Sequence, residues 1–138
     1  MNTSPLHEQP RAAFVTGGAK RIGRAVALAL ARHGYAIAIG FNRSQSEAQS
    51  LARDIMALGV RAAAVHAHLS GPDDSEDIVA RAAAAIGPLT LLINNASLFE
   101  ADEFGALDTA LWDRHFAVNL RAPVLLAQAF AKQTPDGA

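Results

Sequence analysis

The stretch Phe14–Ala25, FVTGGAKRIGRA, constrains the fold most, because it joins an apolar strand pattern to a helical pattern through a glycine turn. Backbone N–H groups at the start of a helix, together with the helix dipole, favour a bound phosphate. We expect Gly17 to let a phosphate approach the turn and Gly23 to let the helix pack closely on the strand. Taken alone, the stretch is also compatible with an ordinary strand-to-helix loop rich in small residues.

Strand and helix patterns alternate along the chain. Strands are predicted at residues 12–15, 35–40, 60–69 and 89–93, and helices at about 20–33, 44–58, 73–86 and 108–132, with a kink at Pro123. Ile22, Val26 and Leu30 recur at helical spacing in the first helix, and Leu51, Ile55 and Leu58 are expected on the buried side of the second. Such alternation implies right-handed crossovers and a parallel sheet. We predict an α/β fold, a Rossmann-type doubly wound sheet (βαβαβαβα, strand order 3-2-1-4), with a ligand at the carboxyl ends of strands 1 and 4.

Composition indicates one globular domain. The chain has 138 residues, 51% of them hydrophobic, and we assign residues 11–138 to the domain and residues 1–10 to a flexible tail. A net charge of −1 gives no basic footprint for nucleic acid, and the absence of cysteine excludes disulfides and thiolate metal sites. Neither His66 nor His68 has a metal-ligand partner at convincing spacing. The first ten residues lack the apolar core of a signal peptide and no apolar run could span a bilayer, so we expect a cytoplasmic protein with no membrane segment.

The loop after the second strand bears on the choice of nicotinamide cofactor. It reads Asn42-Arg43-Ser44, with no acid before Glu47. A carboxylate there would accept hydrogen bonds from the 2′-hydroxyl of NAD, whereas an arginine suits the 2′-phosphate of NADP. The sequence therefore predicts NADP(H), although a solvated loop arginine is the commoner role of such a residue.

Several of these motifs resemble those of the short-chain dehydrogenase/reductase family. Thr16, Gly17 and Gly23 match its Thr-Gly-x-x-x-Gly-x-Gly turn, with Arg21 where the middle glycine usually stands. The form Gly-x-x-Lys-Arg-x-Gly is similar to the pteridine reductase branch. Asn94-Asn95-Ala96-Ser97 resembles the family's Asn-Asn-Ala-Gly signature, and the stretch from Asn95 to Phe99 is similar to the Asn-Ala-Ser-x-Phe of pteridine reductases.

The resemblance implies roles for particular residues. Those expected to bind the cofactor lie in the turn and after the strands: Gly17, Lys20, Arg21, Ile22, Gly23, Asn42, Arg43, Ser44, Leu69, Ser70, Asn95, Ala96 and Ser97. Ser97 and Phe99 would orient a flat substrate ring, although a loop phenylalanine can equally be a core side chain. Asn119, in the family's Val-Asn-Leu, would be the catalytic residue that supports a water in the proton relay. His68 stands where the family usually has an adenine-binding aspartate, which is a departure from the family's pattern.

The family's Tyr-x-x-x-Lys pair is absent from this chain, whose one tyrosine, Tyr35, is followed four residues on by Ile39. The resemblance therefore covers only the N-terminal half of the family's domain. It implies an NADPH-dependent reductase, with pterin or dihydrofolate-like substrates preferred and a homo-oligomer, tetramer or dimer, as the assembly. The alternatives are a general carbonyl or 3-oxoacyl reductase of the same family and a non-catalytic NADP-binding or interaction module.

Overall fold

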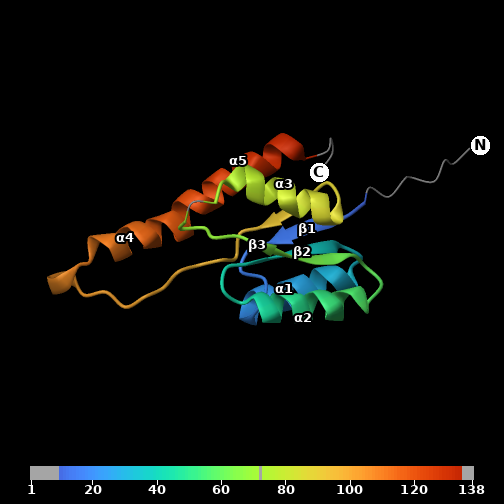
Figure 1. Ribbon diagram of the computed structural model, residues 1–138, viewed down its shortest axis with the longest axis horizontal. Helices are drawn as coiled ribbons and strands as arrows, with labels where there is room; N and C mark the ends of the chain where they lie inside the picture. The colour runs from blue at the N-terminus through green and yellow to red at the C-terminus, as the bar shows by residue number, and fades with distance from the viewer. Residues whose placement is uncertain (1–9, 72, 135–138) are drawn as a thin grey trace, which may run out of the picture.

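A parallel sheet lies at the centre of the structure, a computed structural model that describes residues 10–71 and 73–134 (Figure 1). Its strands are β1 (Ala12–Val15), β2 (Ala36–Phe41), β3 (Ala62–His66) and β4 (Leu91–Ile93). They pair in the order β3-β2-β1-β4 and every pair is parallel, which confirms the predicted strand order. Apart from Pro10, the tail predicted for residues 1–10 lies outside the described residues.

Helices cover both faces of the sheet, as a doubly wound fold requires (Figure 1). One face carries α1 (Arg21–Arg32) and α2 (Gln45–Met56), and the other carries α3 (Ser75–Ile86) and α5 (Ala122–Gln133). Successive strand residues point to opposite faces. Phe14 accordingly packs in the core beneath α3 and α5, and Val15 in the core beneath α1 and α2. Full burial of one such side chain contributes roughly 1.5–3 kcal/mol.

The buried face of α1 consists of small residues, although larger apolar residues also recur at helical spacing in its sequence. Gly23, Ala27 and Ala31 are buried, whereas Ile22 is 73% exposed. A Cβ at position 23 would lie 2.2 Å from the Gly17 carbonyl oxygen, so the helix start touches the turn that precedes it. The helix therefore approaches the sheet too closely for large side chains. In α2 the prediction for Leu51 and Ile55 is confirmed, but Leu58 lies beyond the end of the helix and is exposed.

The third strand is shorter than the predicted span of residues 60–69. It ends at His66, because the chain then turns and the Asp73 carboxylate accepts a hydrogen bond from the His68 amide at 2.7 Å. The helix that follows begins at Ser75 instead of residue 73. Asp74 is its N-cap, and its carboxylate accepts from the Glu76 amide at 3.1 Å.

The last predicted helix is divided. After a 3-10 turn, η1 (Phe104–Ala106), it comprises α4 (Thr109–Phe116), a π-helical segment η2 (Ala117–Arg121) and α5. Pro123 is the second residue of α5 and has no N–H to donate to the carbonyl four residues earlier. Just before Pro123 the helix is wider, since the Ala122 amide donates to the Ala117 carbonyl five residues earlier. None of the helices in the described part of the chain combines the length and the hydropathy of a bilayer-spanning segment.

We predict that Gly23→Ala strongly destabilises the full-length protein. The added methyl group would lie 2.6 Å from the Asn95 side-chain nitrogen as well as against the Gly17 carbonyl, and overpacking of this kind costs about 1–3 kcal/mol. Urea unfolding measures the loss. Gly105→Ala is the control, because a Cβ there meets no atom within 4 Å. A Gly23 variant as stable as the Gly105 variant would contradict the close packing.

Candidate functional site

A hollow of about 700 Å³ lies at the carboxyl ends of the strands. Its lining comes from the segments that follow β1, β2, β3 and β4, which is where the topology predicts a ligand. Every residue that the sequence predicted to bind a cofactor is in this lining, namely Gly17, Lys20, Arg21, Ile22, Gly23, Asn42, Arg43, Ser44, Leu69, Ser70, Asn95, Ala96 and Ser97. The fold therefore brings together residues that are up to 80 positions apart in the chain.

The floor of the hollow is held by Thr16 and Asn95. The Thr16 hydroxyl is buried and accepts hydrogen bonds from the amides of Asn95 and Ala96, both at 3.0 Å. In return, Asn95 Nδ2 donates to the carbonyls of Thr16 and Gly17, again both at 3.0 Å. These bonds join the end of β1 to the end of β4. The motif that contains Thr16 does not predict its role as the acceptor for two backbone amides.

The glycine turn is fitted tightly between neighbouring strands. Gly17 has a φ of +58°, and a Cβ there would lie 2.9 Å from Ala96 Cα. The Gly18 amide donates to the Gly40 carbonyl at 2.9 Å, which ties the turn to β2. Glycine at position 17 is thus required by the contact with Ala96 and by the left-handed backbone, in addition to any approach of a phosphate.

Arg21 begins α1 in a strained conformation. Its φ is +53°, and no other non-glycine residue in the described part of the chain has a positive φ. The left-handed region costs an ordinary residue roughly 1–2 kcal/mol. Strain of this kind tends to cluster at functional sites. Arg21 occupies the position where the family's turn usually has glycine, and it lines the hollow.

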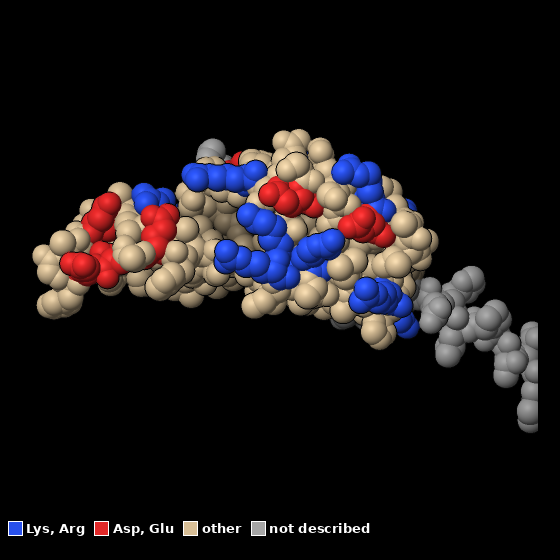
Figure 2. Space-filling model, turned by 90° about the horizontal axis from the view of Figure 1, so that it is seen from below, with Lys and Arg blue, Asp and Glu red and all other residues tan. Residues whose placement is uncertain are grey.

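The hollow is predominantly basic. Figure 2 shows lysine and arginine side chains gathered around the hollowed part of this face, and the cations in the lining are Lys20, Arg21, Arg43 and Arg114. The one acid in the lining, Glu100, pairs with Arg114 at 3.4 Å. Such a surface favours an anionic ligand.

Glu47, in the first turn of α2, is the nearest acid after Arg43 in the sequence. Hydrogen bonds from its own backbone N–H and from the Ser46 hydroxyl lower the pKa of Glu47, and the charge of Lys20 lowers it further. The carboxylate therefore stays ionised at neutral pH and offsets part of the positive charge of Lys20.

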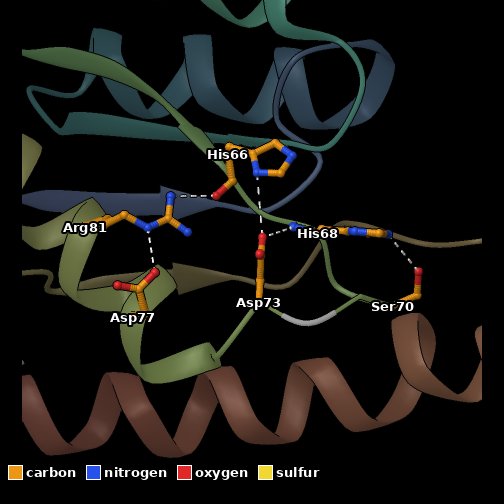
Figure 3. A network of polar contacts seen from close by, with 6 residues as sticks. All are labelled: His66, His68, Ser70, Asp73, Asp77 and Arg81. Carbon is orange, nitrogen blue, oxygen red and sulfur yellow. Dashed lines mark hydrogen bonds and ion pairs between the residues drawn. The ribbon is translucent and has the colours of Figure 1, made fainter.

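A polar network shapes the wall after β3 (Figure 3). The Asp73 carboxylate accepts a hydrogen bond from the backbone amide of His68. It also lies beside the ring of His66, with 3.6 Å between Asp73 Oδ2 and His66 Nδ1. His68 Nε2 lies 3.3 Å from the Ser70 hydroxyl, and His68 itself lines the hollow. In the described part of the chain, no group of three histidine, cysteine or acidic residues is arranged to hold a metal ion.

The segment after β4 is attached to the continuous helical rod formed by α4, η2 and α5. Asn119 Oδ1 accepts from the Leu98 amide and Asn119 Nδ2 donates to the Leu98 carbonyl, both at 2.8 Å. The side-chain amide of Asn119 is thus bonded to the backbone of Leu98. Asn119 is not in the lining of the hollow. Phe99 is 90% exposed and does not line the hollow either, whereas Ser97 and Leu98 do.

Comparison with known proteins identifies relatives of this chain. The model of the short chain dehydrogenase family matches residues 11–138. The chain resembles the crystal structure of FolM alternative dihydrofolate reductase 1 from Brucella suis in complex with NADP, with a TM-score of 0.87 and 49% identity over 92% of this chain and 52% of that one. It is 36% identical to L-rhamnose 1-dehydrogenase (NAD(P)(+)) of Sphingomonas sp. over 87% of this chain and 47% of the relative.

A third relative is a 3-oxoacyl-[acyl-carrier-protein] reductase of Staphylococcus aureus, 30% identical over 91% of this chain and 50% of its own. The chain spans about half the length of each of these relatives.

Two substitutions at Arg21 distinguish the effect of its charge on stability from the effect of its backbone strain. Arg21→Gly and Arg21→Ala remove the same cation, but only glycine adopts a φ of +53° at little cost. We expect the glycine variant of the full-length protein to be more stable than the alanine variant by about 1 kcal/mol in thermal or urea unfolding. Lys20, whose φ is −141°, is the control, and there alanine should be at least as stable as glycine. Equal stability of the two Arg21 variants would refute the strain.

Proposed function

Because the chain belongs to the short-chain dehydrogenase family, we propose that it forms the NADP(H)-binding part of a reductase that transfers hydride to a pterin- or dihydrofolate-like substrate. The observation that carries the proposal is the basic hollow, whose lining contains both the glycine turn and the pair Arg43 and Ser44. When bound, the nicotinamide supplies the hydride. A Tyr-x-x-x-Lys proton donor would come from other parts of the full-length protein, since Tyr35 precedes β2 and has no lysine four residues on.

The hollow fits an anionic dinucleotide. The first amides of a helix have no partner within the helix, and here they belong to residues between Gly17 and Gly23 that line the hollow. They would hold the pyrophosphate, favoured by the helix dipole and by the cations of Lys20 and Arg21. Arg43 and Ser44 would hold the 2′-phosphate through charge-assisted hydrogen bonds.

Next to Arg43 and Ser44, on the β3 side of the hollow, Leu69 and Ser70 would border the adenine, which is attached to the same ribose as the 2′-phosphate. Asn95, Ala96 and Ser97 would lie beside the nicotinamide ribose, because they follow β4 at the centre of the topological switch.

Two observations support a pterin-like substrate. The Brucella suis protein, which is 49% identical over most of this chain, is described as an alternative dihydrofolate reductase in complex with NADP. Ser97 lines the hollow, and Phe99 follows it on a segment held by Asn119. In this role Asn119 would support the reaction by fixing that segment as well as by ordering a water.

A general carbonyl or 3-oxoacyl reductase is the second candidate. The observation that favours it is the placement of Phe99, which is exposed to solvent and is not in the lining of the hollow. Relatives of about 30% identity include 3-oxoacyl-[acyl-carrier-protein] reductases. A panel of dihydrobiopterin, dihydrofolate and an acetoacetyl thioester, tested with the full-length protein and NADPH, separates the two. Binding of NADPH without turnover of any substrate would favour a non-catalytic module.

The outer face of the C-terminal rod suits an assembly of several copies. Large apolar side chains are exposed along it, namely Trp112, Phe116, Leu120, Val124 and Leu125. Burial of such a row would stabilise an oligomer at roughly 25 cal/mol per Å² of apolar surface. We therefore include a homo-oligomer, dimer or tetramer, in the proposal. The cytoplasmic location stays a prediction from the sequence.

Arg43→Asp tests the 2′-phosphate assignment. Loss of a charge-assisted pair, with a like charge introduced in its place, should raise the Kd for NADPH by about 30-fold or more while changing the Kd for NADH by less than about threefold. Fluorescence titration of the full-length protein gives both constants. Arg53→Asp makes the same change of charge at an exposed position of α2 outside the lining and should leave both constants as they are. Equal losses for the two cofactors in Arg43→Asp would remove the assignment.

Phe99→Ala tests the substrate class. If the ring stacks on a pterin, its loss should raise KM for dihydrobiopterin about fivefold to tenfold and leave KM for a small ketone within about twofold. Phe104→Ala is the matched control, because Phe104 is a second exposed phenylalanine of the same loop that does not line the hollow. Steady-state kinetics with NADPH measure both. A larger effect on the ketone would point to the carbonyl reductase.

A further inference from the structure

His115, in α4, makes two hydrogen bonds that tie the rod to the segment after β4. Its Nδ1 lies 2.9 Å from the carbonyl oxygen of Leu111, one turn earlier in the helix. Its Nε2 lies 3.1 Å from the backbone nitrogen of Glu100. The second bond spans 15 positions in the sequence and reaches a residue that lines the hollow.

The two partners fix the state of the ring. A carbonyl oxygen can only accept, so Nδ1 must hold the hydrogen, and a backbone amide can only donate, so Nε2 must present its lone pair. The neutral Nδ1-protonated imidazole satisfies both, and each end of the ring is then engaged.

His115 and Asn119 hold neighbouring parts of one short segment. Asn119 bonds both backbone groups of Leu98, and His115 accepts from Glu100. Phe99 therefore lies between two residues whose backbone is attached to the rod. Glu100 has a further contact with the rod through its carboxylate, which pairs with Arg114.

We propose that His115 is a positioning residue for substrate, because it fixes the path of residues 97–100 together with Asn119. The inference rests on the proposed function, in which Ser97 and Phe99 orient the substrate ring. It adds a residue that neither borders the hollow nor belongs to any motif of the sequence. His115 acts on Phe99 through the backbone of Glu100.

The chain offers a matched control for the helix contact. His33 at the end of α1 also bonds the carbonyl four residues earlier, with Nδ1 2.8 Å from the Ala29 oxygen. It is exposed and lies outside the lining of the hollow. His33→Leu removes a bond of the same kind without touching the segment after β4.

Hydrogen exchange tests the anchor without reference to any substrate. In the full-length protein, His115→Leu should increase exchange of the backbone amides in residues 98–103 by about fivefold, since one neutral hydrogen bond is lost. His115→Gln should restore protection, because a carboxamide oxygen can accept from the Glu100 amide. His33→Leu should leave this segment as in the wild type. Unchanged exchange in His115→Leu, or no rescue by glutamine, would overturn the proposal.

Kinetics then test the role in positioning. His115→Leu should raise KM for dihydrobiopterin about fivefold and leave the Kd for NADPH within about twofold, and glutamine should restore KM. Combined with Phe99→Ala it should add little, because both changes remove the same contact with substrate. Fully additive losses, or a matching loss of NADPH affinity, would overturn the positioning role. Faster exchange in His115→Leu with no turnover of dihydropterin by the wild type would refute the pterin substrate and still support the anchor.

Discussion

The hydrogen bonds between Thr16 and Asn95 are the constraint on which the rest of the site depends. Two strands of a parallel sheet end side by side with backbone groups that the ladder no longer pairs, and a buried polar group without a partner costs about 1–3 kcal/mol. The Thr16 hydroxyl and the Asn95 amide satisfy these groups reciprocally. They also fix where the chain leaves β1, and therefore where Gly17 turns and where α1 begins. The position of the hollow depends on that geometry, because Gly17 and the first residues of α1 line it.

The strand order and the lining of the hollow could be predicted because both follow from where motifs fall relative to strand ends. Parallel strands place their carboxyl ends at one edge, so residues after each strand must meet there. The buried face of α1 could not be predicted from apolar spacing, for a physical reason. Periodicity counts large apolar side chains such as Ile22, but the close contact of Gly23 with the Gly17 carbonyl admits only small ones.

Other features could not be predicted, because they depend on bonds between side chains and backbone that leave no pattern in the sequence. His115 reaches Glu100 only because the loop after β4 returns along the rod. The π-helical segment could not be predicted in full for a similar reason. Pro123 predicts a defect in the helix, but the position and form of the defect depend on which carbonyls find partners. The backbone strain at Arg21 could not be predicted either, since the sequence alone does not give a φ value.

The segment from Asn95 to Glu100 links the two halves of the candidate site. At its start, the Asn95 amide is bonded to the end of β1, and further along Leu98 and Glu100 are bonded to the rod formed by α4, η2 and α5. A short chain held at both ends has few alternative conformations to lose when a ligand binds, so less of the binding free energy is spent on ordering it. The same bonds make the rod the support of this wall of the hollow, because Leu98 and Glu100 both line it and both are bonded to the rod.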